Sequence, residues 1–189
     1  MIARRLFLFG FVTALLTAFG CSSGGDGGGT TTPALLCGDA SPAAANAVTM
    51  ACGGSADGTI ERVDVVIGGP ASGSTTLRGL NFDVTYDPTT LEFVSAASDT
   101  SDLFPSTALL VASLFDDQPG QVVVSIQQAG SDPDVVVPTG QHVAVSLSFR
   151  RVAGVTFTPT PLEFDNAEAT AASPTIGFPG VSGLAVSYQ

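Results

Sequence analysis

The sequence predicts an all-β protein, an antiparallel two-sheet β-sandwich of the jelly-roll type with about 8–9 strands. From Thr59 onward, apolar side chains alternate with polar ones over short segments, as they do in strands that bury one face. Segments rich in Gly, Pro and Asp separate these runs about every 8 to 14 residues. After the N-terminal segment, no apolar stripe of helical period with capping residues occurs, which disfavours α/β architectures.

The first segment, residues 1–20, has the pattern of a signal peptide. Arg4 and Arg5 precede an apolar run, Leu6 to Phe19, that is too short to span a bilayer comfortably. The paired arginines also fit part of a twin-arginine export signal, but a basic pair is common to export signals in general. We therefore expect the protein to be exported.

Residues 16–21, LTAFGC, resemble the lipobox of bacterial lipoproteins. This resemblance implies that Cys21 is lipidated and becomes the mature N-terminus, whereas an ordinary secretory signal is the alternative. Residues 21–36 then form a flexible linker of Gly, Ser and Thr. Because two or more acyl chains attach a protein stably, we expect a lipid anchor in the bacterial cell envelope, at the outer membrane and facing the periplasm or the surface.

Two cysteines, Cys37 and Cys52, remain after Cys21. In an exported protein such a pair most often forms a disulfide, and closing the loop 37–52 contributes about 3 kcal/mol in the chain-entropy model. The pair predicts a disulfide-closed N-terminal flap over residues 37–58. A metal site is the alternative, but it needs more ligands than two thiols and His142 can supply.

The sandwich is expected over residues 59–189. Its first strand carries Val63, Val65 and Ile67 on one face, and residues 68–74 form a loop. Residues 107–115 are apolar on both parities, which suits a strand covered on both sides, with a short helix as the alternative. Residues 116–120 are a turn and residues 130–138 a loop. The other predicted strands lie at 79–86, 91–94, 122–127, 143–149, 162–164 and 184–188.

The stretch 79–94, GLNFDVTYDPTTLEFV, reads as two strands joined by a turn at Asp87-Pro88. A strand that ends in Tyr-Asp-Pro and is followed by Leu-Glu-Phe-Val resembles part of a cohesin domain, the β-sandwich module that binds dockerins. Residues 140–149 and 183–188 resemble later strands of the same family, so the resemblance spans about residues 59–189. It implies protein docking. The family commonly carries Asn and Asp seven and five residues before the Tyr, where this chain has Gly79 and Asn81.

Charge and motifs exclude several functions. The formal net charge is −11 with no lysine, so the surface repels nucleic acid and anionic lipid headgroups. The sequence contains no Gly-x-Ser-x-Gly, no Gly-rich phosphate loop and no His-Glu-x-x-His, and its single histidine, His142, is expected at the surface. We therefore expect no enzyme, no cofactor and no metal. The acidic pairs Asp99/Asp102, Asp116/Asp117 and Asp132/Asp134 are interpreted as solvated turn residues, with Ca²⁺ ligation as the alternative.

The predicted function is that of a non-catalytic, membrane-tethered binding module for protein–protein docking or adhesion. The cohesin resemblance implies binding through an exposed sheet face, where Asn81, Asp83 and Thr85 are the candidate binding residues, with a dockerin-like or other envelope or secreted protein as partner. A carbohydrate-binding module that binds polysaccharide is one alternative. Sugar binding usually relies on exposed aromatic side chains, but this chain has no Trp, and Tyr86 lies on the same face of its strand as the core residues. Phe178 is a further aromatic that could serve. A purely structural envelope lipoprotein is the other alternative.

Overall fold

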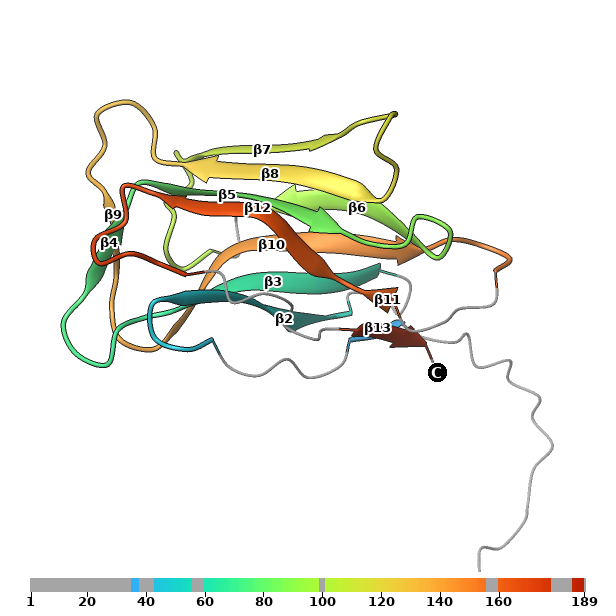
Figure 1. Cartoon of the computed structure of the whole chain (residues 1–189), viewed down its shortest axis with the longest axis horizontal. Coiled ribbons are helices and arrows are strands. Elements are labelled where there is room, and N and C mark those ends of the chain that lie inside the picture. Colours follow the sequence, from blue (N-terminus) through green and yellow to red (C-terminus); the bar gives the residue numbers. More distant parts are fainter. Residues whose placement is uncertain are drawn as a thin grey trace, which may run out of the picture. The chain divides into compact units, whose positions relative to one another are not determined.

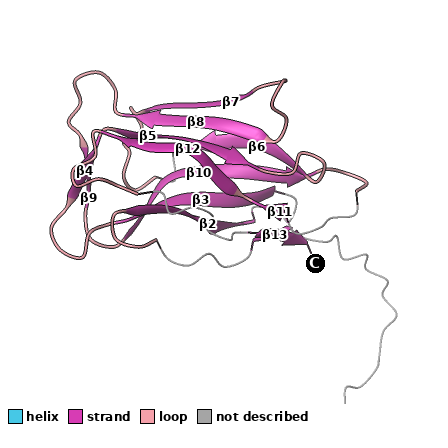
Figure 2. Cartoon of the chain, in the orientation of Figure 1, coloured by secondary structure: helices cyan, strands magenta, loops and turns pink. Residues whose placement is uncertain are grey.

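The computed structural model describes residues 35–37, 43–55, 60–98, 101–155, 160–177 and 185–188. All of them belong to one compact unit, Thr32–Gln189. These residues contain 13 strands and no helix, so the predicted all-β class is confirmed (Figure 2). Within the same ranges there is no helix of the length and apolar character needed to cross a membrane. The predicted signal peptide and Cys21 lie outside the described residues.

Two four-stranded antiparallel sheets form the sandwich (Figure 1). In spatial order, the first sheet consists of β2 (Ala47–Ser55), β3 (Ile60–Gly68), β10 (Gln141–Arg151) and β6 (Leu91–Ala97). The second consists of β12 (Glu163–Thr170), β5 (Gly79–Thr85), β8 (Gln121–Gln127) and β7 (Leu109–Leu114). There are also two small sheets among the described residues. One consists of β1 (Leu35–Cys37), β13 (Ala185–Tyr188) and β11 (Thr160–Pro161), and the other of β4 (Thr75–Leu77) and β9 (Val135–Val137). The predicted two-sheet sandwich is confirmed.

The core lies between the two large sheets and is built from alternate residues of their strands. The fully buried side chains include Val63, Val65 and Ile67 of β3, Leu80, Phe82 and Val84 of β5, Val122, Val124 and Ile126 of β8, and Val145, Leu147 and Phe149 of β10. Because side chains alternate between the faces of a strand, burial of these positions turns the polar residues between them outward. The inward faces predicted for these strands are therefore confirmed at these positions, whereas Val143, predicted on the same face of β10, lies across a register shift and is only half-buried, and Ala144 is fully buried.

The segment 37–58 differs from the predicted flap. Its main part is β2, which pairs along its whole length with β3, and its Val48 and Met50 are fully buried in the common core. The predicted linker also ends early, because Leu35 and Leu36 belong to β1. Residue 59 is thus no boundary of the sandwich, since β2 buries apolar side chains as fully as the strands after it.

Two other segments differ from the predictions. Residues 130–138, predicted as a loop, contain β9, which pairs with β4 and buries Val135 and Val137. The stretch 107–115, predicted as a strand covered on both sides, contains the edge strand β7. Leu109, Val111 and Leu114 there are 63%, 57% and 54% exposed. A strand with one hydrogen-bonded neighbour at the end of a sheet has too few facing residues to cover both its faces.

The predicted turn at Asp87-Pro88 is confirmed, and its hydrogen bonds are local. The Asp87 carboxylate accepts hydrogen bonds from the backbone N–H of Thr89 at 2.9 Å and from its hydroxyl at 2.7 Å. The Leu91 N–H donates to the Asp87 carbonyl at 2.9 Å, and β6 begins there. These bonds to Thr89 hold the pKa of Asp87 below its usual range.

Removing this carboxylate is expected to lower stability in a pH-dependent manner. Because the folded-state pKa is below the unfolded one, the stabilisation is present above the ordinary carboxyl pKa of about 3.9 and is lost as the pH falls through the folded-state value. We therefore expect Asp87→Ala to lower Tm at neutral pH and the difference from wild type to shrink in acid. Thermal unfolding of both proteins across this range tests it, and a constant difference in Tm would contradict the assignment.

Candidate functional site

The outer face of the second sheet has a polar centre on Asn81. Its side-chain oxygen accepts hydrogen bonds from the Ser125 hydroxyl at 2.7 Å and from the Gln127 amide at 3.3 Å, both on β8. Its amide group donates to Thr170 at 3.2 Å and to Glu168 at 3.4 Å, both on β12. Asn81 thus links three strands across the face.

The next two predicted binding residues lie on the same face and are less accessible. Asp83 is 8% exposed, and its Oδ2 accepts hydrogen bonds from the side-chain amides of Gln121 and Asn166, each at 2.8 Å. Thr85 is half-buried and pairs with Gln121 on β8 and Glu163 on β12. Asn81, Asp83 and Thr85 share the outer face of β5, as the alternation predicts, but neighbouring strands already occupy hydrogen-bonding groups of Asn81 and Asp83.

Exposed apolar residues border this polar centre on one side. Leu109 and Val111 of β7 pair directly with Gln127 and Ser125 of β8, so their side chains share the outer face with those residues. We define the docking face as Asn81, Leu109, Val111, Ser125 and Gln127. Leu109 and Val111 are not among the predicted binding residues, because a run that is apolar on both parities does not reveal which positions lie uncovered.

A pocket opens where β7 ends. It has a volume of about 380 Å³, and its lining includes Tyr86, Glu92, Leu114, Phe115 and Asp116. Leu114 and Phe115 are 54% and 48% exposed. Burial raises the pKa of the Tyr86 hydroxyl. Tyr86 was expected in the core and instead is half-buried at the margin of the core. Its ring lies edge-on to the buried ring of Phe149, with 5.4 Å between the centroids.

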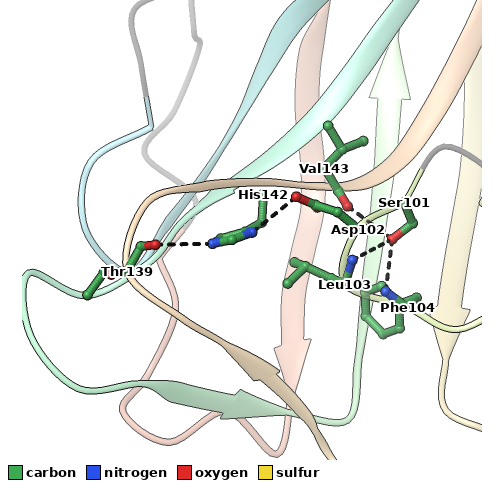
Figure 3. Close-up of polar contacts among 7 residues, drawn as sticks. All are labelled: Ser101, Asp102, Leu103, Phe104, Thr139, His142 and Val143. Atoms are coloured by element: carbon green, nitrogen blue, oxygen red, sulfur yellow. Dashed lines mark hydrogen bonds and ion pairs between the residues drawn. The ribbon is translucent and has the colours of Figure 1, made fainter.

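The single histidine lies beside a serine and an aspartate, as Figure 3 shows, but the three do not form a catalytic relay. The His142 Nδ1 atom is 3.1 Å from Asp102 Oδ2, and its Nε2 atom is 3.3 Å from the Thr139 carbonyl oxygen. The Ser101 hydroxyl donates instead to the Val143 carbonyl at 3.0 Å and accepts from the Phe104 N–H at 2.9 Å. In a relay the serine hydroxyl bonds to the imidazole. These contacts hold the 101–104 loop against β10.

The arginine Arg78 contacts one of the acidic pairs proposed as turn residues. It donates to the Asp132 carbonyl at 2.8 Å and forms an ion pair with Asp134 at 3.3 Å. Asp99 lies outside the described residues. In the part of the chain that the structure describes, no three His, Cys, Asp or Glu side chains gather as a metal site would require.

The two cysteines predicted to pair, Cys37 and Cys52, are placed only in part. Cys52 lies half-buried on β2 and is disulfide-bonded. Cys37 ends β1, and its side chain is outside the described set. The Cys37–Cys52 disulfide therefore stays a prediction. Tyr188, in β13, and Phe178 likewise have no described side chains.

No known family profile and no curated protein matches this chain. Among solved structures, the chain is similar to the cohesin module of a Clostridium perfringens family 33 glycoside hydrolase, with 12% identity, a TM-score of 0.48 and coverage of 75% of this chain and 93% of that one. It is also similar to the seventh ScaB type I cohesin of Pseudobacteroides cellulosolvens, with 16% identity, a TM-score of 0.46 and coverage of 78% and 88%. A third similar structure is the Coh-OlpC-Doc435 cohesin–dockerin complex of Clostridium thermocellum, with 12% identity, a TM-score of 0.41 and coverage of 82% and 85%. Each of these is a likeness in fold alone, and the cohesin resemblance at Tyr86-Asp87-Pro88 is one of sequence.

Proposed function

We propose that this protein is a membrane-tethered, non-catalytic docking module of the cell envelope that binds a protein partner through the docking face. One observation carries the proposal: the outer face of the second sheet joins a polar centre on Asn81 to exposed Leu109 and Val111. Protein interfaces commonly combine an apolar patch with hydrogen-bonding groups around it. The polar centre is held rigid by bonds from two neighbouring strands, so binding needs little reordering of these side chains.

Tethering and export rest on the sequence before the sandwich. The lipobox-like residues 16–21 and the Gly-rich linker after them favour a lipid-anchored domain held away from a membrane. The non-catalytic assignment is supported by the placement of Ser101, whose hydroxyl donates to a backbone carbonyl and not to His142. A dockerin-like protein with calcium loops is the first partner to test, because the sequence resemblance is to cohesins.

Affinity capture from the envelope and secreted fractions of the same cell, with the full chain as bait, tests this function. We expect the wild type to recover a protein partner and Ser125→Arg, which places a long cation in the centre of the docking face, to reduce the recovery at least tenfold. Ser95→Arg is the matched control, because Ser95 is exposed on β6 of the other sheet. It should bind as the wild type does.

Three results would contradict the proposal. Equal recovery by Ser125→Arg, with its fold checked by circular dichroism, would show that the docking face is not used. Retention of the chain on insoluble polysaccharide, without a protein partner, would favour a carbohydrate-binding module. If the chain binds neither a protein nor polysaccharide, the result would favour a structural envelope component.

A further inference from the structure

The edge strands of the two large sheets are protected to different degrees. Natural sheets block unwanted strand pairing with charges, prolines, bulges or covering segments. On β12, acidic side chains and a register shift between Asp165 and Glu168 interrupt the edge. On β2, the Val48 N–H donates to the Gly177 carbonyl at 2.9 Å, so another segment partly covers that edge. By contrast β7, LLVASL, has no charge and no proline, and its pairing with β8 runs without a shift.

The backbone of β7 presents hydrogen-bonding groups at this edge. In antiparallel strands, successive residues direct their N–H and C=O groups to opposite neighbours. The bonds from Tyr86 N–H to the Gly120 carbonyl at 2.8 Å and from Gln128 N–H to the Arg78 carbonyl at 3.0 Å indicate that even-numbered residues of β8 bond to β5. The odd-numbered ones therefore bond to β7.

The register then identifies the groups that face outward. Because Leu109 and Val111 pair with odd-numbered residues of β8, their backbone N–H and C=O groups point toward β8. Leu110, Ala112 and Leu114 therefore direct theirs to the open edge. Among the backbone hydrogen bonds between loops and strands of the described residues, none involves these three. Figure 1 shows β7 at the outer border of its sheet, with β8 on one side.

Charge at the end of β7 indicates what kind of strand fits. Asp116 and Asp117 follow β7 directly and are exposed, and within the described chain neither forms an ion pair. An added antiparallel strand would begin beside them, next to the pocket that Leu114 and Phe115 line. A second copy of this chain is a poor occupant, because its net charge of −11 repels another copy.

We propose that the β7 edge binds an extended segment of a protein partner as an added antiparallel strand, with apolar residues at alternate positions and basic residues just before it. Main-chain hydrogen bonds from Leu110, Ala112 and Leu114 hold the segment. Asp116 and Asp117 pair with its basic residues, and the apolar pocket takes a side chain at its start. The inference rests on the proposed function in requiring a protein partner, but it uses the strand edge and not the docking face.

A synthetic peptide of two lysines followed by alternating valine and threonine is the probe, and its affinity for the full chain is measured by fluorescence anisotropy. We expect Ala112→Pro to weaken binding at least tenfold, because proline removes one outward N–H while sparing the bonds to β8. Ala112→Val keeps that N–H and should bind within about twofold of wild type. Replacing both Asp116 and Asp117 with Asn should weaken binding about 2–10-fold at low salt, a difference that high salt removes.

Several outcomes would overturn the inference. Equal binding by Ala112→Pro would do so, as would equal binding of a probe methylated on its backbone nitrogens, which tests the wild type without any change in its fold. Self-association that Ala112→Pro abolishes would replace the assigned partner with a second copy. Ser125→Arg separates the two proposals: probe binding that survives this substitution while partner recovery is lost supports strand addition beside the docking face. Partner recovery without any probe binding leaves the docking function standing and overturns strand addition.

Discussion

Replacing Phe82 with alanine is expected to lower the free energy of unfolding by about 3–5 kcal/mol. Phe82 is 1% exposed in the middle of β5, and its ring meets Phe164 edge-on at 5.3 Å between centroids. Truncation loses the transfer free energy of the ring and the aromatic contact, and it leaves a cavity between strands that cannot close around it. Urea denaturation of the full chain, followed by circular dichroism, measures the change.

The matched control for this substitution is Phe115→Ala. Phe115 is 48% exposed at the end of β7, so its removal should change the unfolding free energy by less than about 1 kcal/mol. Phe82→Leu should fall between the two, because leucine fills part of the space. A Phe82→Ala protein as stable as Phe115→Ala would show that β5 does not lie at the centre of the core.

The sequence predicted the elements whose pattern has one physical interpretation. On β5, apolar and polar residues alternate strictly, and β8 and β10 depart from that alternation only at Val123 and Ala144, so one face of each strand is clearly the apolar one. The turn after Tyr86 was equally clear, since Pro88 cannot donate to a ladder and Asp87 accepts bonds from the residue two places on. Local chemistry decides such features, and a single sequence contains it.

The elements that were mispredicted depend on what lies opposite them. β2 contains small residues and two glycines, which read as a flap, yet pairing with β3 buries its Val48 and Met50. For β7, the residues alone indicate burial, and its position at the end of the sheet leaves it exposed. The hydrogen bonds that Gln121 and Asn166 donate to the Asp83 carboxylate also depend on the register of three strands. Such long-range pairing is not encoded in local periodicity.

The second large effect is expected at Gly120, which directly precedes β8 and is hydrogen-bonded to Tyr86, the residue after β5. It has φ of +85°, and its carbonyl accepts the 2.8 Å hydrogen bond from the Tyr86 N–H. A Cβ at this position would lie 2.4 Å from the Tyr86 carbonyl oxygen. Gly120→Ala therefore combines a left-handed backbone, about 1–2 kcal/mol, with a backbone displacement of about 1–3 kcal/mol.

A second glycine separates these two costs. Gly154 has a similar φ of +77°, but a Cβ there would meet nothing within 4 Å. Gly154→Ala should thus lose about 1–2 kcal/mol, whereas Gly120→Ala should lose about 2–5 kcal/mol in the same denaturation experiment. Because Gly120 also lines the pocket at the end of β7, Gly120→Ala should reduce probe binding while Gly154→Ala leaves it unchanged. Equal losses of stability in the two variants would mean that the close approach of Gly120 to Tyr86 relaxes without cost, and that the pocket is not held by this contact.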